Sequence, residues 1–319
     1  DYSNGKFNTS NLANLLIFGL QNEEMLRNYI HSNFLPKILS RIKYLFQINT
    51  LRQAKRNIYQ HYDLGNDFYK LWLDDSMTYS SALFKSESES LIAAQNNKYD
   101  RILERLGDAK NLLEVGCGWG GFMDRALSRG DYNIKGITIS DAQSAYARDR
   151  LKNSAKVLVE DYRLQSGRYD GIVSIEMFEA VGVKYWPIYF AKLKQLLKNR
   201  AKAVIQTIVI KDELFLDYKK SSDMLRTYIF PGGLLPSEQI FRQKAENRGL
   251  KVNDTYFFGN DYAKTLELWL ERFDERYQQV KALGFDDEFI RLWRFYLASC
   301  IASFKTGRTN VMQIELENV

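Results

Sequence analysis

The sequence predicts an α/β fold built on a doubly wound, mostly parallel sheet of seven strands. Three observations predict this class: short β-rich runs alternate with helical segments from about Tyr99, a glycine-rich turn follows the first run, and two further runs close the chain. Such alternation is typical of strands joined by crossover helices that cover both faces of one sheet. The composition, 45% hydrophobic and 26% charged, is that of an ordinary globular protein.

The elements follow in order along the chain. Five strands are expected first, over Asn111–Val115, Ile134–Ile139, Lys156–Val159, Tyr169–Ile175 and Ala201–Ile210. The helices between them are expected at Gly121–Arg129, Asp141–Leu151 and Lys184–Lys198. Residues 211–236 then form a long excursion, in the right place for a lid over an active site. The last elements are a helix near Ser237–Arg248, a strand near Val252–Phe258, helices at Ala263–Leu283 and Asp287–Phe304, and a strand at Asn310–Glu317. The two closing strands predict a reversed strand at the edge of the sheet.

The region 1–60 is expected to be a helical appendage, distinct from the main domain at 61–319. Between residues 31 and 60 there are six cations and no acidic residue, and six equals the net charge of the whole chain. Apolar residues recur there at helical spacing, which is typical of a basic amphipathic helix on an anionic membrane surface. The six cations are Lys37, Arg41, Lys43, Arg52, Lys55 and Arg56. A helix that packs on the main domain and keeps its lysines in water is an equally open alternative, whereas no motif supports nucleic acid.

The composition also limits which cofactors, metal sites and proton-transfer groups the chain can use. Cys117 and Cys300 are too few for a disulfide framework or a structural zinc site, so no metal and a reducing, cytoplasmic compartment are expected. No apolar stretch approaches the roughly 20 residues of a membrane span. The first residue is Asp1, so a missing N-terminal part is one alternative. Neither His31 nor His61 is near the glycine-rich turn, which leaves a carboxylate, a tyrosine or a bound ion for proton transfer.

The glycine-rich turn reads E-x-G-x-G-x-G-G, beginning at Glu114 and including Gly116 and Gly118. Glycines let the backbone turn sharply and approach a ligand closely. An acid two residues before the first glycine suits the ammonium and carboxylate of S-adenosylmethionine better than a pyrophosphate; an ordinary tight turn is the alternative. At the end of the second strand Thr138, Ile139 and Gln143 are expected at the cofactor, whereas Asp141 is expected to cap the next helix. Asp161, after the third strand, offers a carboxylate to the adenine amino group, or is a simple loop acid.

Several longer motifs stand in a fixed order along the chain. They are His61-Tyr62-Asp63-Leu64-Gly65-Asn66-Asp67-Phe68-Tyr69, Met77-Thr78-Tyr79-Ser80-Ser81, the glycine-rich turn, Met177-Phe178-Glu179-Ala180-Val181-Gly182, and Tyr228 to Gly233. In these motifs the chain resembles the cyclopropane-fatty-acid synthases and the mycolic-acid methyltransferases. The resemblance covers about Ala54 to the C-terminus and implies the Rossmann-like class I methyltransferase fold with S-adenosylmethionine bound beside an acyl tunnel. It implies that the cofactor is lined by Tyr79, Ser80, Gly116, Gly118, Thr138, Gln143, Asp161 and Tyr162.

The same resemblance implies a base site that holds bicarbonate. Glu179, the backbone at Ile208 and Tyr262 match the family, but Ser81 and Gln206 stand where it typically has a cysteine and a histidine. An amide still donates a hydrogen bond, so an anion remains compatible, although it supplies no charge. Whether bicarbonate binds is therefore open, and Glu179 is an alternative base.

The leading hypothesis is transfer of a methyl group to a double-bond carbon of unsaturated acyl chains in membrane phospholipids. The product expected is a cyclopropane or a methyl-branched or methylene acyl chain, made by a cytoplasmic enzyme associated peripherally with the membrane. One alternative is a methyltransferase for a soluble small molecule, and another is a non-catalytic lipid- or cofactor-binding homologue. The N-terminal helices are candidates for forming a homodimer.

Overall fold

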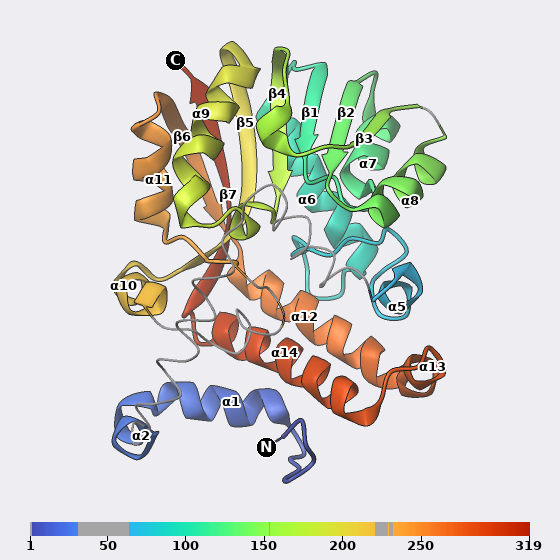
Figure 1. Ribbon diagram of the computed structural model, residues 1–319, viewed down its shortest axis with the longest axis vertical. Coiled ribbons are helices and arrows are strands. Elements are labelled where there is room, and N and C mark those ends of the chain that lie inside the picture. Colours follow the sequence, from blue (N-terminus) through green and yellow to red (C-terminus); the bar gives the residue numbers. More distant parts are fainter. Residues whose placement is uncertain (1, 31–63, 153, 221–228, 230–231) are drawn as a thin grey trace.

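The computed structural model describes residues 2–30, 64–152, 154–220, 229 and 232–319. One sheet of seven strands forms its centre, in the order β3-β2-β1-β4-β5-β7-β6 (Figure 1). The strands are β1 (Asn111–Val115), β2 (Asn133–Thr138), β3 (Lys156–Val159), β4 (Tyr169–Ile175), β5 (Leu197–Ile210), β6 (Leu250–Phe257) and β7 (Thr309–Asn318). The first five are parallel neighbours, which confirms the doubly wound α/β class.

The prediction of a reversed edge strand was wrong in its placement. The reversed strand is β7, which pairs antiparallel with both β5 and β6 and so lies second from the edge. β6 forms the edge and runs parallel to β5. The last strand of the chain therefore inserts between two earlier ones. It pairs with a strand on each side: nine residue pairs run from Lys202↔Glu317 to Ile210↔Thr309 on the β5 side, and the register shifts between Val252 and Asp254 on the β6 side.

Helices cover both faces of the sheet because successive strand residues point to opposite sides. Leu112, Val173 and Val204 face α6 (Leu91–Leu106), α7 (Gly121–Arg129) and α8 (Asp141–Leu151). Their neighbours Leu113, Ile172 and Ala203 face α9 (Trp186–Leu196) and α11 (Glu238–Glu246). The cap of α8 differs from the prediction, because Ser140 caps it through the amide of Gln143 and Asp141 lies in the first turn.

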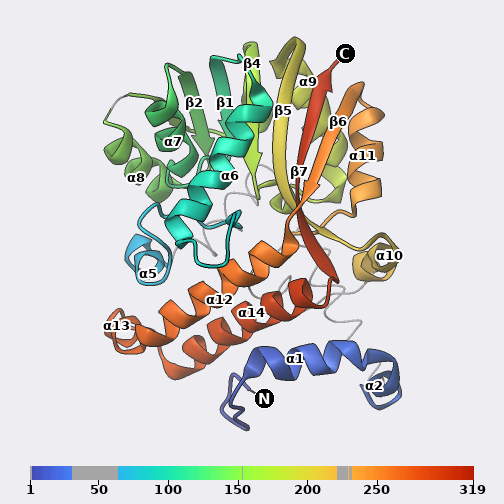
Figure 2. The same ribbon diagram turned by 180° about the vertical axis from the view of Figure 1, so that it is seen from behind.

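A third, helical layer lies at the carboxyl ends of the parallel strands. It contains α12 (Gly259–Glu275), α13 (Tyr277–Ala282) and α14 (Asp287–Lys305), and the short helix α5 (Asn66–Lys70) joins its aromatic core (Figures 1 and 2). The single helix expected over Ala263–Leu283 is instead broken at Arg276, which is the C-cap of α12 and the N-cap of α13.

The N-terminal helices α1 (Leu12–Gln21) and α2 (Glu23–Ile30) follow a non-helical start, and α1 lies against α14 (Figure 2). The basic segment 31–60 and the domain boundary near residue 60 lie outside the described residues and stay predictions. Of the expected lid, α10 (Asp212–Lys220) is described, whereas residues 221–228 and 230–231 are not. Within the described residues, every helix is too short or too polar to cross a bilayer.

Candidate active site

The glycine-rich turn leaves the end of β1 and is held against the end of β2. The amides of Gly116 and Cys117 both donate to the carbonyl of Ile137 at 2.9 Å. Gly116 and Gly118 have positive φ angles of 82° and 51°, a conformation that costs other residues about 1–2 kcal/mol. A Cβ on Gly116 would come within 2.9 Å of Met177 Cγ, whereas a Cβ on Gly118 would meet nothing within 4 Å. The turn is thus tightly packed at Gly116, whereas there is open space beside Gly118.

Glu114 lies just before this turn, on β1, and its side chain is buried. Burial raises the pKa of its carboxyl to about 8, and Lys98 opposes the rise. Its Oε2 atom has no hydrogen-bond partner among the described residues. A buried acceptor without a partner beside an open glycine turn fits the ammonium end of S-adenosylmethionine.

The predicted ribose and adenine residues also converge at the strand ends. The Thr138 hydroxyl donates to Gln143 Oε1 at 2.8 Å, and the half-buried Ile139 follows directly after β2. Glu160 donates its amide to the carbonyl of Thr138, which draws the loops after β2 and β3 together. The contacts of these residues with the cofactor stay predictions.

Asp161 and Tyr162 follow β3 in the same loop. The Asp161 carboxylate accepts from the amide of Arg163 at 2.9 Å and pairs with its guanidinium at 2.6 Å, so this acid also has the structural role weighed from the sequence. Tyr162 packs edge-on against Tyr189, and burial raises the pKa of its phenol above the ordinary value. Its hydroxyl has no hydrogen-bond partner in the described part of the chain.

The segment of Tyr79, Ser80 and Ser81 contacts several side chains around the site. The Tyr79 and Tyr296 hydroxyls are 2.7 Å apart, and the Ser80 hydroxyl accepts a 2.6 Å hydrogen bond from Lys98 Nζ. The Ser81 hydroxyl donates to the carbonyl of Ala82, so its side chain does not serve the base site. The backbone amide of Ser81, by contrast, donates a hydrogen bond into the base site.

That amide belongs to a cluster that the sequence analysis missed, centred on Glu176. Oε1 of Glu176 accepts from the Ser81 amide and from Gln206 Nε2, each at 2.8 Å, and Oε2 accepts from the Tyr262 hydroxyl at 2.5 Å. Gln313 Nε2 donates to Gln206 Oε1 at 3.0 Å, which directs the Gln206 amide nitrogen toward the carboxylate. Burial raises the pKa of Glu176, while these hydrogen bonds and Lys98 oppose the rise.

Glu179, the predicted base, lies on a single turn of 3-10 helix, Phe178–Ala180. Its Oε1 accepts from the amide of Ile208 at 2.5 Å. Burial, and secondarily the charge of Glu176, raise the pKa of Glu179 to about 8. The five residues assigned to the base site therefore form two groups: Ser81, Gln206 and Tyr262 hold Glu176, while Ile208 holds Glu179.

Two sequence signals could have found the missed residues. Glu176 directly follows the buried strand β4, and ligands in open α/β sheets bind at the carboxyl ends of the strands. Lys98 lies four residues after Ala94 and four before Ile102, on the apolar face of α6, where an ordinary lysine would not be expected. It is fully buried, and burial lowers the pKa of its ammonium to about 7 while Glu176 opposes the fall.

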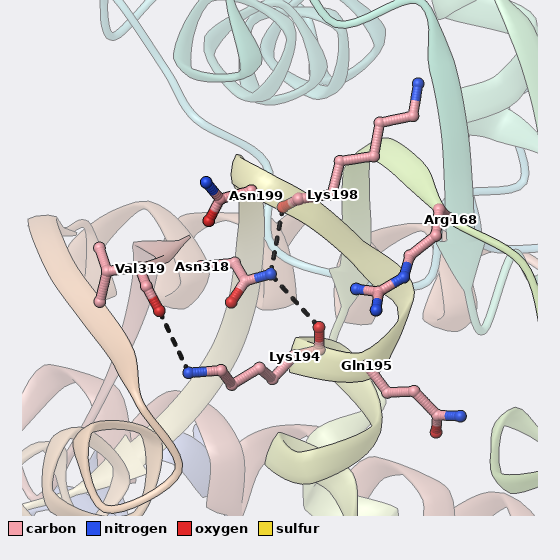
Figure 3. A pocket seen from close by; sticks show the side chains of 7 residues that line it. All are labelled: Arg168, Lys194, Gln195, Lys198, Asn199, Asn318 and Val319. Atoms are coloured by element: carbon pink, nitrogen blue, oxygen red, sulfur yellow. Dashed lines mark hydrogen bonds between the residues drawn. The ribbon is translucent and has the colours of Figure 1, made fainter.

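A surface cavity of about 590 Å³ lies away from these residues, at the opposite edge of the sheet. In Figure 3, Lys194 donates to the carbonyl of Val319, and Asn318 donates to the carbonyls of Lys194 and Lys198. These contacts join the end of α9 and the start of β5 to the end of β7, whereas substrates of such folds bind at the carboxyl ends of the parallel strands. We assign this cavity no role in the chemistry. Among the described side chains, no group of three metal-binding residues is found.

Known proteins are similar to this chain in sequence and in fold. A family model described as mycolic acid cyclopropane synthetase matches residues 49–314. Tuberculostearic acid methyltransferase UfaA1 of Mycobacterium tuberculosis is 40% identical over 276 residues, which cover 82% of this chain and 64% of UfaA1. Cyclopropane-fatty-acyl-phospholipid synthase of Escherichia coli is 34% identical over 274 residues, 85% of this chain and 70% of the synthase.

Among solved structures, the mycolic acid cyclopropane synthase CmaA1 complexed with SAH and CTAB has a TM-score of 0.77 and 32% identity, and covers 82% of this chain and 98% of CmaA1. The cyclopropane synthase MmaA2 from Mycobacterium tuberculosis also has a TM-score of 0.77, at 29% identity. These matches confirm the resemblance read from the motifs. The chain spans slightly less than two thirds of UfaA1.

Proposed function

Because this chain belongs to the mycolic acid cyclopropane synthetase family of S-adenosylmethionine-dependent methyltransferases, we propose that it methylates a double-bond carbon of an unsaturated acyl chain in a membrane phospholipid. The observation that carries the proposal is a pair of buried carboxyl groups, Glu176 and Glu179, close to the glycine-rich turn. A group of packed aromatic side chains, called the aromatic wall below, adjoins this pair; it consists of Tyr79, Tyr262, Trp269 and Phe304. Relatives named for fatty-acyl-phospholipid and tuberculostearic acid chemistry support an acyl substrate.

The residues around the glycine turn would hold the donor. Gly118 leaves room for the amino-acid end, and Glu114 offers an unpartnered carboxylate to its ammonium. Thr138 and Gln143 present polar groups at the end of β2, where nucleotide folds bind the ribose. S-adenosylmethionine supplies an electrophilic methyl group when it is bound, and these residues would fix its direction.

The aromatic wall would exclude water from the reacting double bond. Tyr79 and Trp269 have ring centroids 5.4 Å apart, and Tyr262 lies 4.5 Å from Phe304 and 6.2 Å from Trp269 by the same measure. An alkene is a weak nucleophile, so it must be aligned with the methyl group, and water must be kept from the carbocation that forms. Aromatic faces also attract a cation.

Loss of a proton from that carbocation gives a cyclopropane or a methylene group, whereas a saturated methyl branch requires a further reduction. We further propose that the basic segment 31–60 brings the protein to the anionic, cytoplasmic face of a membrane, where its substrate lies. The uniform positive charge of this segment supports that location. Pairing of two copies through the N-terminal helices stays a prediction.

The test uses S-adenosylmethionine labelled in its methyl group and vesicles of an anionic, cis-unsaturated phospholipid. We expect label in the acyl chains and a mass gain of one methylene unit, with no label in matched vesicles of saturated lipid. A parallel reaction with a water-soluble unsaturated acyl ester examines the soluble-substrate alternative. Absence of label in every lipid, while calorimetry shows that the donor binds, would falsify the proposed function.

A further inference from the structure

We propose that the carboxylate of Glu176 occupies the place that the family resemblance assigns to bicarbonate and is itself the base that removes the proton from the substrate cation. This inference rests on the proposed function, since it names the base of that same reaction. It differs from both alternatives read from the sequence, a bound bicarbonate and Glu179.

The hydrogen-bond donors expected to bind bicarbonate are already engaged by Glu176. The Ser81 amide, Gln206 Nε2 and the Tyr262 hydroxyl all donate to its two oxygens, at 2.8, 2.8 and 2.5 Å. They come from three distant segments of the chain: the loop before α6, the strand β5 and the helix α12. A separate bicarbonate would need these same donors, so the residues present do not fit it. The planar, anionic group they surround is a side chain.

The backbone at Glu176 adopts a conformation that a side chain normally disfavours. Its φ angle is 49°, in the left-handed region, which costs a residue other than glycine about 1–2 kcal/mol. Its amide donates to the carbonyl of Gln206 at 2.8 Å, and this contact fixes the turn after β4. Such backbone strain is concentrated at functional sites, where surrounding contacts hold it. Here the strained turn directs the carboxylate into the donor cluster.

The surrounding charges favour one ionised carboxylate in the pair of Glu176 and Glu179. Lys98 is fully buried and is the largest favourable charge acting on Glu176. Glu176 receives three donated hydrogen bonds and Glu179 a backbone one, and the pKa of Glu179 is raised to about 8. Two nearby carboxyls do not both ionise readily, and the three donors and Lys98 favour the charge on Glu176 and the proton on Glu179.

This arrangement explains the two departures from the family pattern. A free anion must be bound from solution, whereas a tethered carboxylate is already in place, so a neutral amide at Gln206 suffices as a donor. Ser81 contributes only its backbone amide, which makes its side-chain identity unimportant to the pocket. The positive charge that a histidine could supply comes instead from the buried Lys98, which opposes the rise in the pKa of Glu176.

The proposed step conserves atoms and electrons. The π electrons of the alkene form the new carbon–carbon bond to the methyl group, and the sulfur–carbon bond breaks with its electron pair remaining on sulfur. Glu176 then takes a proton from the carbocation. The electron pair of the broken C–H bond closes the ring, or forms a carbon–carbon double bond. Glu176 leaves the step as a neutral carboxylic acid and returns its proton to solvent.

The experiment compares wild-type protein, Glu176→Gln and Glu176→Gly in buffers stripped of carbon dioxide and in buffers with millimolar bicarbonate. We expect wild-type turnover to be the same in both. Glu176→Gln should lose about 10²–10⁴-fold in turnover in both buffers, because an amide fills the pocket but takes no proton. Glu176→Gly should be equally slow without bicarbonate and should recover in its presence, because the vacated donors can then bind the free anion. Glycine also suits the positive φ, so this variant should fold.

Two further measurements make the result independent of turnover. Bicarbonate should raise the melting temperature of Glu176→Gly and leave wild-type protein unchanged, as expected for a ligand that binds only the opened pocket. All variants should retain donor affinity by calorimetry. Glu271→Gln, an exposed change on α12, is the matched control and should behave as wild type throughout.

Wild-type turnover that falls on removal of bicarbonate and returns on its addition would overturn the proposal. So would full activity of Glu176→Gly without bicarbonate, or a folded, donor-binding Glu176→Gly that the anion neither stabilises nor reactivates. If the wild-type protein labels no lipid at all, the proposed function has failed. The melting experiment still reports in that case whether Glu176 fills an anion pocket.

Discussion

The substitution Gly118→Ala separates the donor-binding role of the glycine turn from its structural role. Gly118 has a φ angle of 51°, and a Cβ there would meet nothing within 4 Å. In the unliganded protein the only cost is therefore the left-handed conformation, about 1–2 kcal/mol of unfolding free energy. In the complex the new methyl group would stand where the donor is expected to approach. An overlap of about 1–3 kcal/mol corresponds to a roughly 5- to 150-fold weaker affinity.

Gly107→Ala is the matched control. Gly107 has a φ angle of 62°, also with nothing within 4 Å of a built Cβ, but it caps the end of α6 before β1 begins, at the opposite edge of the sheet. Its ψ angle of −126° lies outside the left-handed helical region, so alanine there should cost at least about 1–2 kcal/mol of stability and leave donor affinity unchanged. Gly116→Ala should destabilise the fold more than Gly118→Ala, because its Cβ would lie 2.9 Å from Met177 Cγ.

Urea unfolding gives the stability of each variant, and calorimetry with S-adenosylmethionine gives its affinity. The decisive comparison is between the donor affinities of the folded Gly118→Ala and Gly107→Ala variants. If both bind the donor as tightly as the wild-type protein, Gly118 does not line the donor site and the role assigned to the turn is refuted.

Three other predictions concern charge. Because the pKa of Glu114 is raised from 4.5 to about 8 in the folded state, the folded protein holds more protons than the unfolded chain in that window, and unfolding free energy falls as pH rises through it. In the absence of donor, Glu114→Gln should make this fall shallower by up to about 1.4 kcal/mol per pH unit, and denaturant unfolding at a series of pH values that shows an unchanged slope would contradict the assignment. Lys98→Met should cost about 3–5 kcal/mol of stability in urea titrations because it leaves buried acids without their counter-charge, whereas the exposed Lys281→Met should change little; equal effects would argue against the role of Lys98. Replacing the six cations of segment 31–60 by glutamine should weaken the free energy of binding to anionic vesicles by about 1 kcal/mol per charge. Sedimentation with the vesicles measures this binding, and unaltered binding would exclude the segment as the membrane contact.

The sequence by itself determined most of the secondary structure of the main domain. β1, β3 and β4 begin and end where the residue patterns predict, because their apolar runs are bounded by turn and charge signals close along the chain. The glycine turn was also readable locally, since the need for positive φ angles selects glycine at Gly116 and Gly118. The family motifs then predicted which residues surround the donor, and those contacts stay predictions.

Only the tertiary structure decided the order of the last strands and the centre of the base site. A strand pattern does not encode which edge it joins, and β7 enters between β5 and β6 because both edges offer it hydrogen bonds. Glu176 reads in the sequence as one more acid after a strand. Its surroundings come from Ser81, Gln206 and Tyr262, which are far apart along the chain, so their convergence exists only once the chain has folded.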